Sequence, residues 1–172
     1  MSFSSGYVKA KLIALYFLNG FRDDISKESL SGIIGDHGWA SYLEILGCLD
    51  ELEEQRMIAA IPRPFGQSYR ITQLGISTLG TFVEELRLSL RREIDDYIEK
   101  NREELRKDTQ YIGDWEQQLD GSYVVSLKVA EGNRILFGIE LHLPDVESAR
   151  RAVRNFRDNA IDLHSVIIEK LL

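Results

Sequence analysis

The stretch Tyr42–Thr72, YLEILGCLDELEEQRMIAAIPRPFGQSYRIT, decides the fold, because the spacing of its apolar residues changes from that of a helix to that of strands. In its first part apolar residues recur at intervals of three and four, which predicts a helix from about Trp39 or Ser41 to Gln55. The residues expected on the buried face of this helix are Tyr42, Ile45, Leu49 and Leu52.

The second part of the stretch predicts a β-hairpin. Met57–Ile61 and Ser68–Ile71 are strand-like, and the segment Pro62–Gln67 between them is rich in turn residues. Thr72 is a good N-cap for a helix that begins at the next residue. A further, very short strand is expected at Ile25.

Two helices are predicted before this stretch. Tyr7–Asn19 has a wide apolar face, and we expect Gly20 to end it. Ser26 is expected to cap a second helix that stops at Gly35. Three helices, a hairpin and a closing helix in this order are typical of a winged helix-turn-helix, in which the hairpin is the wing. We expect this domain to occupy residues 1–79.

Residues 80–108 predict a helical connector. The helical pattern continues to Lys107, with a break expected near Leu88 or Ser89, where the apolar residues change face. Beyond the break one face is apolar and the others are densely charged. A solvated face with ion pairs between neighbouring turns would produce this pattern, and so would a helix that pairs with a second subunit.

Residues 109–172 predict a small α+β domain. Apolar residues alternate in Tyr111–Leu119, Ser122–Ala130 and Arg134–Leu143, which predicts a three-stranded antiparallel meander with one covered face. A last helix begins at Pro144, and its apolar stripe is expected to cover that face. The stripe consists of Ala149, Ala152, Val153, Phe156, Ala160, Leu163, Ile167 and Leu171. The expected fold class of the chain is therefore α+β.

The composition is that of an ordinary globular protein, with 44% hydrophobic and 28% charged residues. The single cysteine, Cys48, excludes an internal disulfide and a Cys-based zinc site, and together with the lack of a signal peptide it predicts a cytoplasmic location. The sequence has no stretch that predicts a membrane span. It also lacks metal-ligand spacings, phosphate-binding loops and nucleophile motifs, so we expect neither a cofactor nor enzymatic activity.

Six stretches of the chain together indicate a family. They are Lys11–Tyr16, Leu49–Ile58, Tyr69–Thr72 followed by Gly75, Glu93–Ile98, Glu104–Gln110 and Tyr123–Val129. In order and spacing the chain resembles an uncharacterised winged-helix family of Gram-positive bacteria, the domain-of-unknown-function family 4364, which is related to the PadR-type transcriptional regulators. The resemblance implies the winged-helix fold and a role in transcriptional regulation.

The charge distribution argues against tight DNA binding. The net charge is −7, with seven Lys or Arg and nine Asp or Glu in residues 1–75, whereas DNA-binding domains usually carry a basic surface. The positions expected to face outward on the third helix are Leu43, Glu44, Gly47, Asp50, Glu51 and Glu54, of which four are acidic and none is basic. Phosphates repel such a face, so if the protein binds DNA we expect the wing and the first helix to hold it more than the third helix does.

The residues predicted to contact DNA come from three elements. On the third helix Ser41 and Tyr42 could reach a phosphate, and Glu44 could accept a hydrogen bond from a cytosine. The first helix supplies two lysines, and the wing supplies two arginines and a glutamine; an arginine of the wing could enter the minor groove. The candidates are Lys9, Lys11, Ser41, Tyr42, Glu44, Arg63, Gln67 and Arg70. Ordinary surface residues would also explain the Lys and Arg side chains.

The predicted function is that of a winged-helix transcriptional regulator that binds DNA as a homodimer. The alternative is a winged-helix module for protein interaction or dimerisation that does not bind DNA. Leu43, Leu46 and Cys48 suggest this alternative, because an apolar patch on an exposed helix often marks a protein contact. The sequence does not identify a small-molecule effector.

Overall fold

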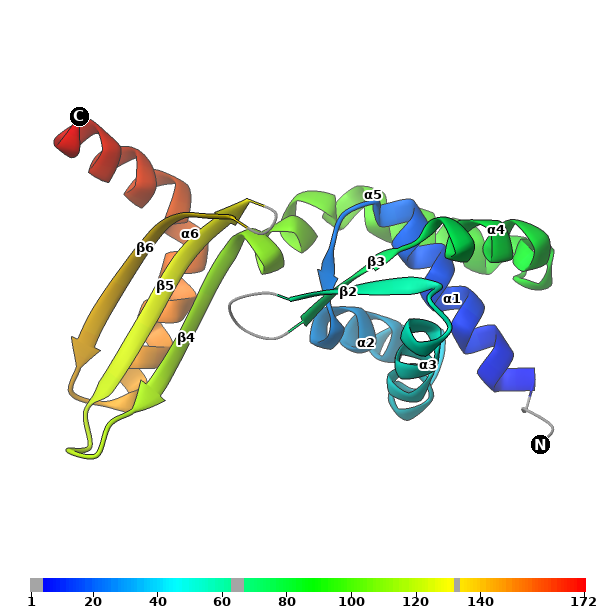
Figure 1. The fold of residues 1–172 in the computed structure, drawn as a ribbon, viewed down its shortest axis with the longest axis horizontal. Coiled ribbons are helices and arrows are strands. Elements are labelled where there is room, and N and C mark those ends of the chain that lie inside the picture. The colour runs from blue at the N-terminus through cyan, green and yellow to red at the C-terminus, as the bar shows by residue number, and fades with distance from the viewer. Residues whose placement is uncertain (1–4, 63–66, 132–133) are drawn as a thin grey trace. The chain divides into compact units, whose positions relative to one another are not determined.

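The computed structural model describes residues 5–62, 67–131 and 134–172 (Figure 1). Arg63, one of the predicted DNA contacts, lies outside the described residues. The chain divides into two compact units, of which the first ends at Arg106 and the second begins at Lys107. Both units contain helices and a three-stranded antiparallel sheet, so the α+β class is confirmed.

The first unit consists of helices with one small sheet. Its elements are α1 (Ser5–Phe21), β1 (Ile25–Ser26), α2 (Lys27–Asp36), α3 (Tyr42–Glu54), β2 (Ile58–Pro62), β3 (Gln67–Ile71), α4 (Gln73–Phe82), a 3-10 turn η1 (Val83–Glu85) and most of α5 (Leu88–Gln110). The strand order is β1-β3-β2, with every pair antiparallel. The short strand predicted at Ile25 is confirmed, since Ile25 pairs with Tyr69.

Short polar side chains fix the starts of three helices. The side-chain oxygens of Ser26, Ser41 and Thr72 accept hydrogen bonds from backbone amides three residues on, at 3.1, 3.2 and 3.1 Å. These bonds satisfy amides that have no partner within their helix. The predicted N-caps Ser26 and Thr72 are therefore confirmed, and the third helix starts after Ser41 rather than at Trp39.

The predicted end of the first helix is wrong. Gly20 is helical, and α1 continues to Phe21, because Phe21 is fully buried in the core. The residue that leaves the helix is Arg22, with a φ of 63°. Gly20 instead permits close packing, since a Cβ there would lie 3.1 Å from the Cδ1 of Ile98 on α5. The side chain of Arg102 donates to the carbonyl oxygens of Gly20 and Phe21 and so caps α1 from α5.

The second helix also ends later than predicted. Gly35 lies within α2, which runs to Asp36, and the glycine with a left-handed backbone is Gly38, at a φ of 66°. A Cβ on Gly35 would lie 3.5 Å from the Cβ of Tyr42, so Gly35 packs against the start of α3.

The third helix buries three of the four residues predicted. Ile45, Leu49 and Leu52 are fully buried, together with Cys48. Tyr42 is 49% exposed, so that part of the prediction is wrong. Tyr42 is the first residue of α3, and its side chain lies outside the core that α1 and α3 share.

Residues 80–106 pack within the first unit. A helix break is confirmed, but it covers residues 83–87, directly before the predicted Leu88 or Ser89, since α4 ends at Phe82 and α5 begins at Leu88. Leu86 between them is fully buried, as is Ile94 on α5, while Ile98 is almost completely buried. The apolar face of α5 is therefore covered by its own chain, and its charged faces are solvated.

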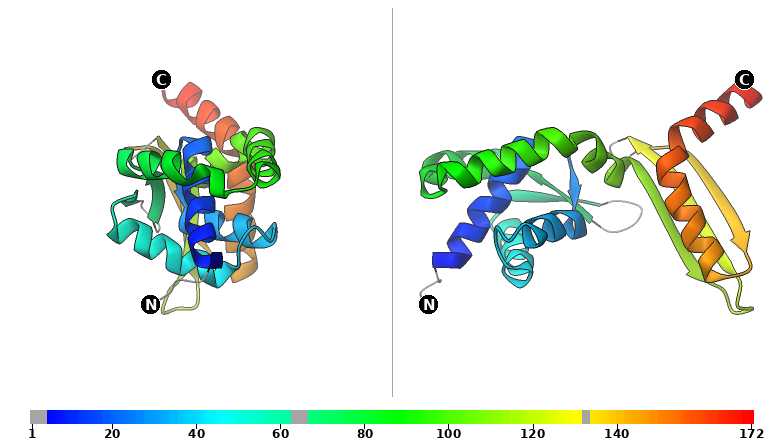
Figure 2. Two further views of the ribbon diagram at one scale, coloured as in Figure 1. Left: turned by 90° about the vertical axis from the view of Figure 1, so that its right-hand side faces the viewer. Right: turned by 180° about the vertical axis from the view of Figure 1, so that it is seen from behind.

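The second unit contains β4 (Tyr111–Gln117), β5 (Tyr123–Glu131), β6 (Arg134–Leu143) and α6 (Val146–Leu171). The strands lie in the order β4-β5-β6, each antiparallel to its neighbour. The side chain of Asp145 accepts a hydrogen bond from the Ser148 amide at 2.7 Å and caps α6. Figure 2 shows α6 against one face of this sheet, with its C-terminal turns continuing beyond it.

The predicted apolar stripe of α6 covers the sheet only in part. Ala149, Phe156 and Ala160 are buried, but Leu163 is 38% and Leu171 is 75% exposed. α6 packs mainly against β4 and β5, because Gly113 on β4 lets it approach: a Cβ there would lie 2.8 Å from the Cγ1 of Val153. The C-terminal part of the stripe therefore lies away from β4 and β5. None of the described helices is long and apolar enough to span a bilayer.

Two glycines of α4 make a matched test of this packing. A Cβ on Gly75 would overlap the carbonyl oxygen of Met57 and lie 2.8 Å from the Cγ1 of Ile71, whereas a Cβ on Gly80 would have no atom within 4 Å. We expect Gly75→Ala to lower the free energy of unfolding by about 1–3 kcal/mol through overpacking. Gly80→Ala should raise it by about 0.5–1 kcal/mol, because alanine favours the helix. Urea denaturation followed by circular dichroism measures both, and equal effects of the two substitutions would contradict the packing described.

Candidate nucleic-acid interface

Two positions of α3 that were predicted to face outward are covered by α1. The Tyr7 hydroxyl donates to the Oε1 of Glu51 at 2.8 Å, and the Nζ of Lys11 lies 2.5 Å from its Oε2. A Cβ on Gly47 would lie 3.2 Å from the Tyr7 hydroxyl oxygen. Gly47 and Glu51 therefore both contact α1 and are half-buried, so the prediction that they face outward holds only in part.

Glu44 closes the start of its own helix. Its Oε2 accepts a hydrogen bond from the Ser41 amide at 3.3 Å, while the Ser41 hydroxyl oxygen accepts one from the Glu44 amide. This reciprocal pair is a capping box. The carboxylate that was predicted to contact cytosine thus stabilises the first turn of α3.

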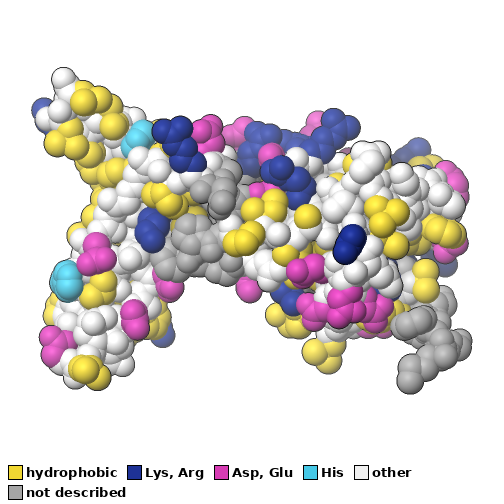
Figure 3. All heavy atoms as spheres, viewed as in Figure 1, with side chains coloured by type: hydrophobic (Ala, Val, Ile, Leu, Met, Phe, Trp, Pro, Cys, Tyr) yellow, Lys and Arg dark blue, Asp and Glu magenta, His cyan; other side chains and the backbone are white. Residues whose placement is uncertain are grey.

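The exposed surface of α3 combines apolar and acidic side chains. Tyr42 and Leu43 are 49% and 79% exposed, and Asp50 and Glu54 are also exposed. Figure 3 shows acidic side chains gathered over α3. In place of the apolar patch predicted from Leu43, Leu46 and Cys48, Leu43 is exposed, Leu46 is half-buried and Cys48 is fully buried.

A cation that the sequence analysis did not select lies beside this surface. The Nζ of Lys27, the first residue of α2, lies 2.6 Å from the Oδ1 of Asp50. The hydrogen bond with Asp50 raises the pKa of Lys27, which stays charged. The sequence could have indicated Lys27 through its position directly after the N-cap Ser26. That position places Lys27 in the first turn of α2, which packs against α3.

Lys9 and Lys11 lie on opposite sides of α1. Residues two positions apart on a helix point about 200° apart. Lys11 contacts Glu51 and lies 5.5 Å from the centre of the Tyr7 ring, whereas the exposed Lys9 lines a hollow of about 310 Å³ with Val8, Leu12 and Glu85. The structure therefore does not bring these two predicted contacts together.

Gln67 and Arg70, the predicted wing residues that are described, contact carboxylates of the first unit. The Nε2 of Gln67 lies 3.4 Å from both carboxylate oxygens of Glu53. The Nη2 of Arg70 lies 2.6 Å from the Oδ1 of Asp24, which is buried. A buried carboxylate destabilises a fold unless a charge compensates it, so Arg70 stabilises the fold through its contact with Asp24.

Cys48, the single cysteine, is placed for packing within the first unit. Burial raises the pKa of the Cys48 thiol to about 11, and its sulfur lies 3.6 Å from the carbonyl oxygen of Tyr7. A thiol with this pKa stays protonated and unreactive at neutral pH. Across residues 5–62, 67–131 and 134–172, no three His, Cys, Asp or Glu residues are grouped so that they could hold a metal ion.

A comparison with protein families identifies the family. The model of the family described as "Domain of unknown function (DUF4364)" matches residues 10–171, so the chain belongs to this family. No curated protein and no solved structure compared with the chain matches it.

The contacts of Glu51 predict a pH dependence of stability. Hydrogen bonds from Lys11 and Tyr7 favour the ionised carboxylate and hold the pKa of Glu51 below its ordinary value. The resulting stabilisation is fully present above the unfolded pKa of about 4.3 and is lost as the pH falls through the lower folded pKa. Glu51→Gln should therefore destabilise the protein at neutral pH, and the difference should shrink in acid.

Urea denaturation across this pH range measures that difference. Glu54→Gln is the control, since Glu54 is an exposed carboxylate on the same helix and its replacement should change little at any pH. A difference between wild type and Glu51→Gln that is equally large above and below the carboxylate pKa would contradict the charge contribution.

Proposed function

We propose that this member of the DUF4364 family is a transcriptional regulator that binds DNA as a homodimer through an N-terminal winged helix-turn-helix. The observation that carries the proposal is the element order α1–β1–α2–α3–β2–β3–α4 with the sheet order β1-β3-β2. In that fold α3 is the recognition helix and the β2–β3 hairpin is the wing. The relationship of this family to PadR-type regulators, which the resemblance implies, is consistent with this role.

The first turn of α3 supports the proposal. Recognition helices contact base edges with their N-terminal residues, and Ser41, Tyr42 and Leu43 at the start of α3 are all exposed. The capping box of Ser41 and Glu44 occupies two of the amides at this N-terminus and places a carboxylate there, so the support for DNA contact comes from the exposure of the three residues. These three residues are therefore proposed to lie at the DNA.

The acidic side chains of α3 repel a phosphate less than the sequence suggests, because several of them have partners within the first unit. Glu44 contributes to the capping box, Glu51 contacts Lys11, and Glu53 contacts the Gln67 amide. Asp50 contacts Lys27 in an ion pair whose carboxylate is 62% exposed. Such a surface pair contributes at most about 1 kcal/mol, so a phosphate could replace Asp50 beside Lys27.

A protein-interaction module remains the second candidate, and a specific observation favours it. Lys11 and Arg70 contact carboxylates of their own unit, while the exposed Tyr42 and Leu43 present an aromatic and an aliphatic side chain next to acidic ones. Aromatic residues are enriched at protein interfaces, and an apolar patch rimmed by polar groups is typical of them.

Fluorescence anisotropy with labelled duplexes from the source genome tests the proposal. We expect binding whose affinity falls as salt rises, since phosphate contacts release counterions. Lys27→Gln should weaken binding. It should also reduce the slope of log affinity against log salt concentration by about one, the effect of losing one phosphate contact. Asp50→Asn should strengthen binding, because it removes a repelled charge and frees Lys27. Lys100→Gln, the same substitution at an exposed residue of α5, is the control and should leave affinity nearly unchanged.

Two results would contradict DNA binding by this surface. One is the absence of binding at about 50 mM salt, where phosphate contacts are strong, and it would favour the protein-interaction module. The other is binding that Lys27→Gln and Asp50→Asn leave unaltered, which would place the DNA elsewhere on the protein.

A further inference from the structure

The C-terminal part of α6 is an apolar helix end without a covering surface in its own unit. Residues 161–172 are all described and none is buried, although seven of these twelve are apolar. Val166 is 53% exposed and Leu171 is 75% exposed. The sheet-facing stripe continues here through Leu163, Ile167 and Leu171 at intervals of four. A surface of this kind is unusual on a monomer.

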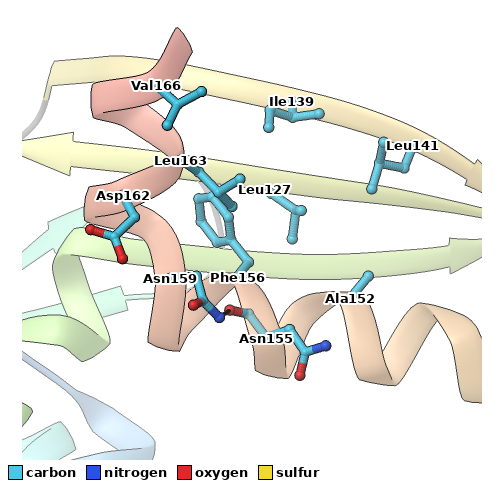
Figure 4. A pocket seen from close by; sticks show the side chains of 10 residues that line it. All are labelled: Leu127, Ile139, Leu141, Ala152, Asn155, Phe156, Asn159, Asp162, Leu163 and Val166. Carbon is cyan, nitrogen blue, oxygen red and sulfur yellow. Dashed lines mark hydrogen bonds between the residues drawn. The ribbon is translucent and has the colours of Figure 1, made fainter. Parts of the chain in front are cut away.

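An apolar groove lies next to this helix end. It has a volume of about 500 Å³, and the side chains of Leu127, Ile139, Leu141, Phe156, Leu163 and Val166 form its apolar walls. In Figure 4 these side chains lie between α6 and the strands, while Asn155, Asn159 and Asp162 form a polar rim along the helix. The groove exists because α6 packs towards β4, which leaves the inner face of β6 half covered.

The second unit also has a small core for its size. The cluster of buried residues in its described part consists of Val125, Leu127, Ala149, Phe156 and Ala160, of which two are alanines. A unit of residues 107–172 is in the size range in which one core gives little stability and oligomerisation often supplies the rest. An apolar partner in the groove would enlarge this core.

We propose that a second copy of the chain covers the end of the groove formed by Leu163 and Val166, and that the α6 ends of two copies pack antiparallel about a two-fold axis at Ile167. A two-fold dimer uses the same patch on both subunits, and here one chain supplies both the projecting apolar end and the groove that receives it. With Ile167 on the axis, Leu163 of each copy faces Leu171 of the other, and the last residues of α6 cover that end of the groove.

The surface carries both an acidic and a basic side chain, so two copies of it can be complementary in charge. With Ile167 on the axis, Lys170 of the second copy lies opposite His164, which is two residues from Asp162 and within the length of a lysine side chain, so the dimer brings Lys170 of each copy near Asp162 of the other. The remaining rim residues, Asn155 and Asn159, are uncharged. This pairing selects a second copy over an unrelated apolar segment. The inference rests on the homodimer of the proposed function and is independent of its DNA binding.

Sedimentation equilibrium of the full-length chain tests the interface. We expect a dimer at micromolar concentration and a dissociation constant raised at least about thirtyfold in Leu163→Asp, the effect of losing a central contact. Leu119→Asp makes the same change at an exposed leucine of the same unit and should leave the dimer intact. Asp162→Lys and Lys170→Asp should each weaken the dimer, and the double variant should restore it. Circular dichroism melting verifies that the variants fold.

A cross-link locates the axis. Ile167→Cys should form a disulfide between two copies under mild oxidation, because a residue on the axis meets itself. Wild type, whose Cys48 is fully buried, and Leu119→Cys should remain uncross-linked. A monomeric wild type, a dimer that Leu163→Asp leaves intact, or equal cross-linking at positions 119 and 167 would overturn the inference. Failure of DNA binding alongside an intact α6 dimer would contradict the proposed function alone.

Discussion

Burial of α1 is the constraint on which the first unit depends. Ala10, Ile13, Ala14, Phe17 and Phe21 are all fully buried, and they lie on several sides of the helix. α1 packs against α3, β3 and α4, and the end of α1 is capped by Arg102 of α5. Apolar burial of this extent is the main source of stability in a domain of this size. The position of each surrounding element therefore follows from its contact with α1.

The same constraint determines which charges remain for a partner. Because α1 lies across α3, Tyr7 and Lys11 face Glu51, and a carboxylate that looked exposed in the sequence becomes part of the helix contact. The contact of Arg70 with the buried Asp24 has a separate cause, since the pairing of β1 with β3 brings the two residues together. Ser41, Tyr42 and Leu43 at the start of α3 stay exposed, with Lys27 beside α3, and this is the surface that we propose for recognition.

Local patterns predicted most of the fold. Hydrophobic period, N-caps and turn residues located the helices and strands, because these depend on neighbours in the sequence. They failed where a distant contact decides the outcome. Gly20 resembles a helix end, but burial of Phe21 extends α1 past it. The apolar stripe of α6 is long enough to cover the whole sheet. Gly113 lets α6 pack close to β4, however, so the stripe covers the sheet only in part.

The candidate site was less predictable than the fold. Residue type indicated which side chains could meet a phosphate, but not which of them already had a partner. Lys9 and Lys11 differ in this respect although they are two residues apart, because one faces Glu51 and the other lines a hollow beside Glu85. The sequence analysis missed Lys27 because only its contact with Asp50, twenty-three positions away, places it beside the surface of α3.

We propose that the start of α3 and Lys27 form the surface that binds DNA. The most direct test is an NMR titration of the isotopically labelled full-length protein with sheared genomic duplex at about 50 mM salt. We expect the backbone amides of Lys27 and of Ser41, Tyr42 and Leu43 to shift most, and added salt to reverse the shifts. No shifts, or shifts confined to α5 and α6, would contradict the proposal.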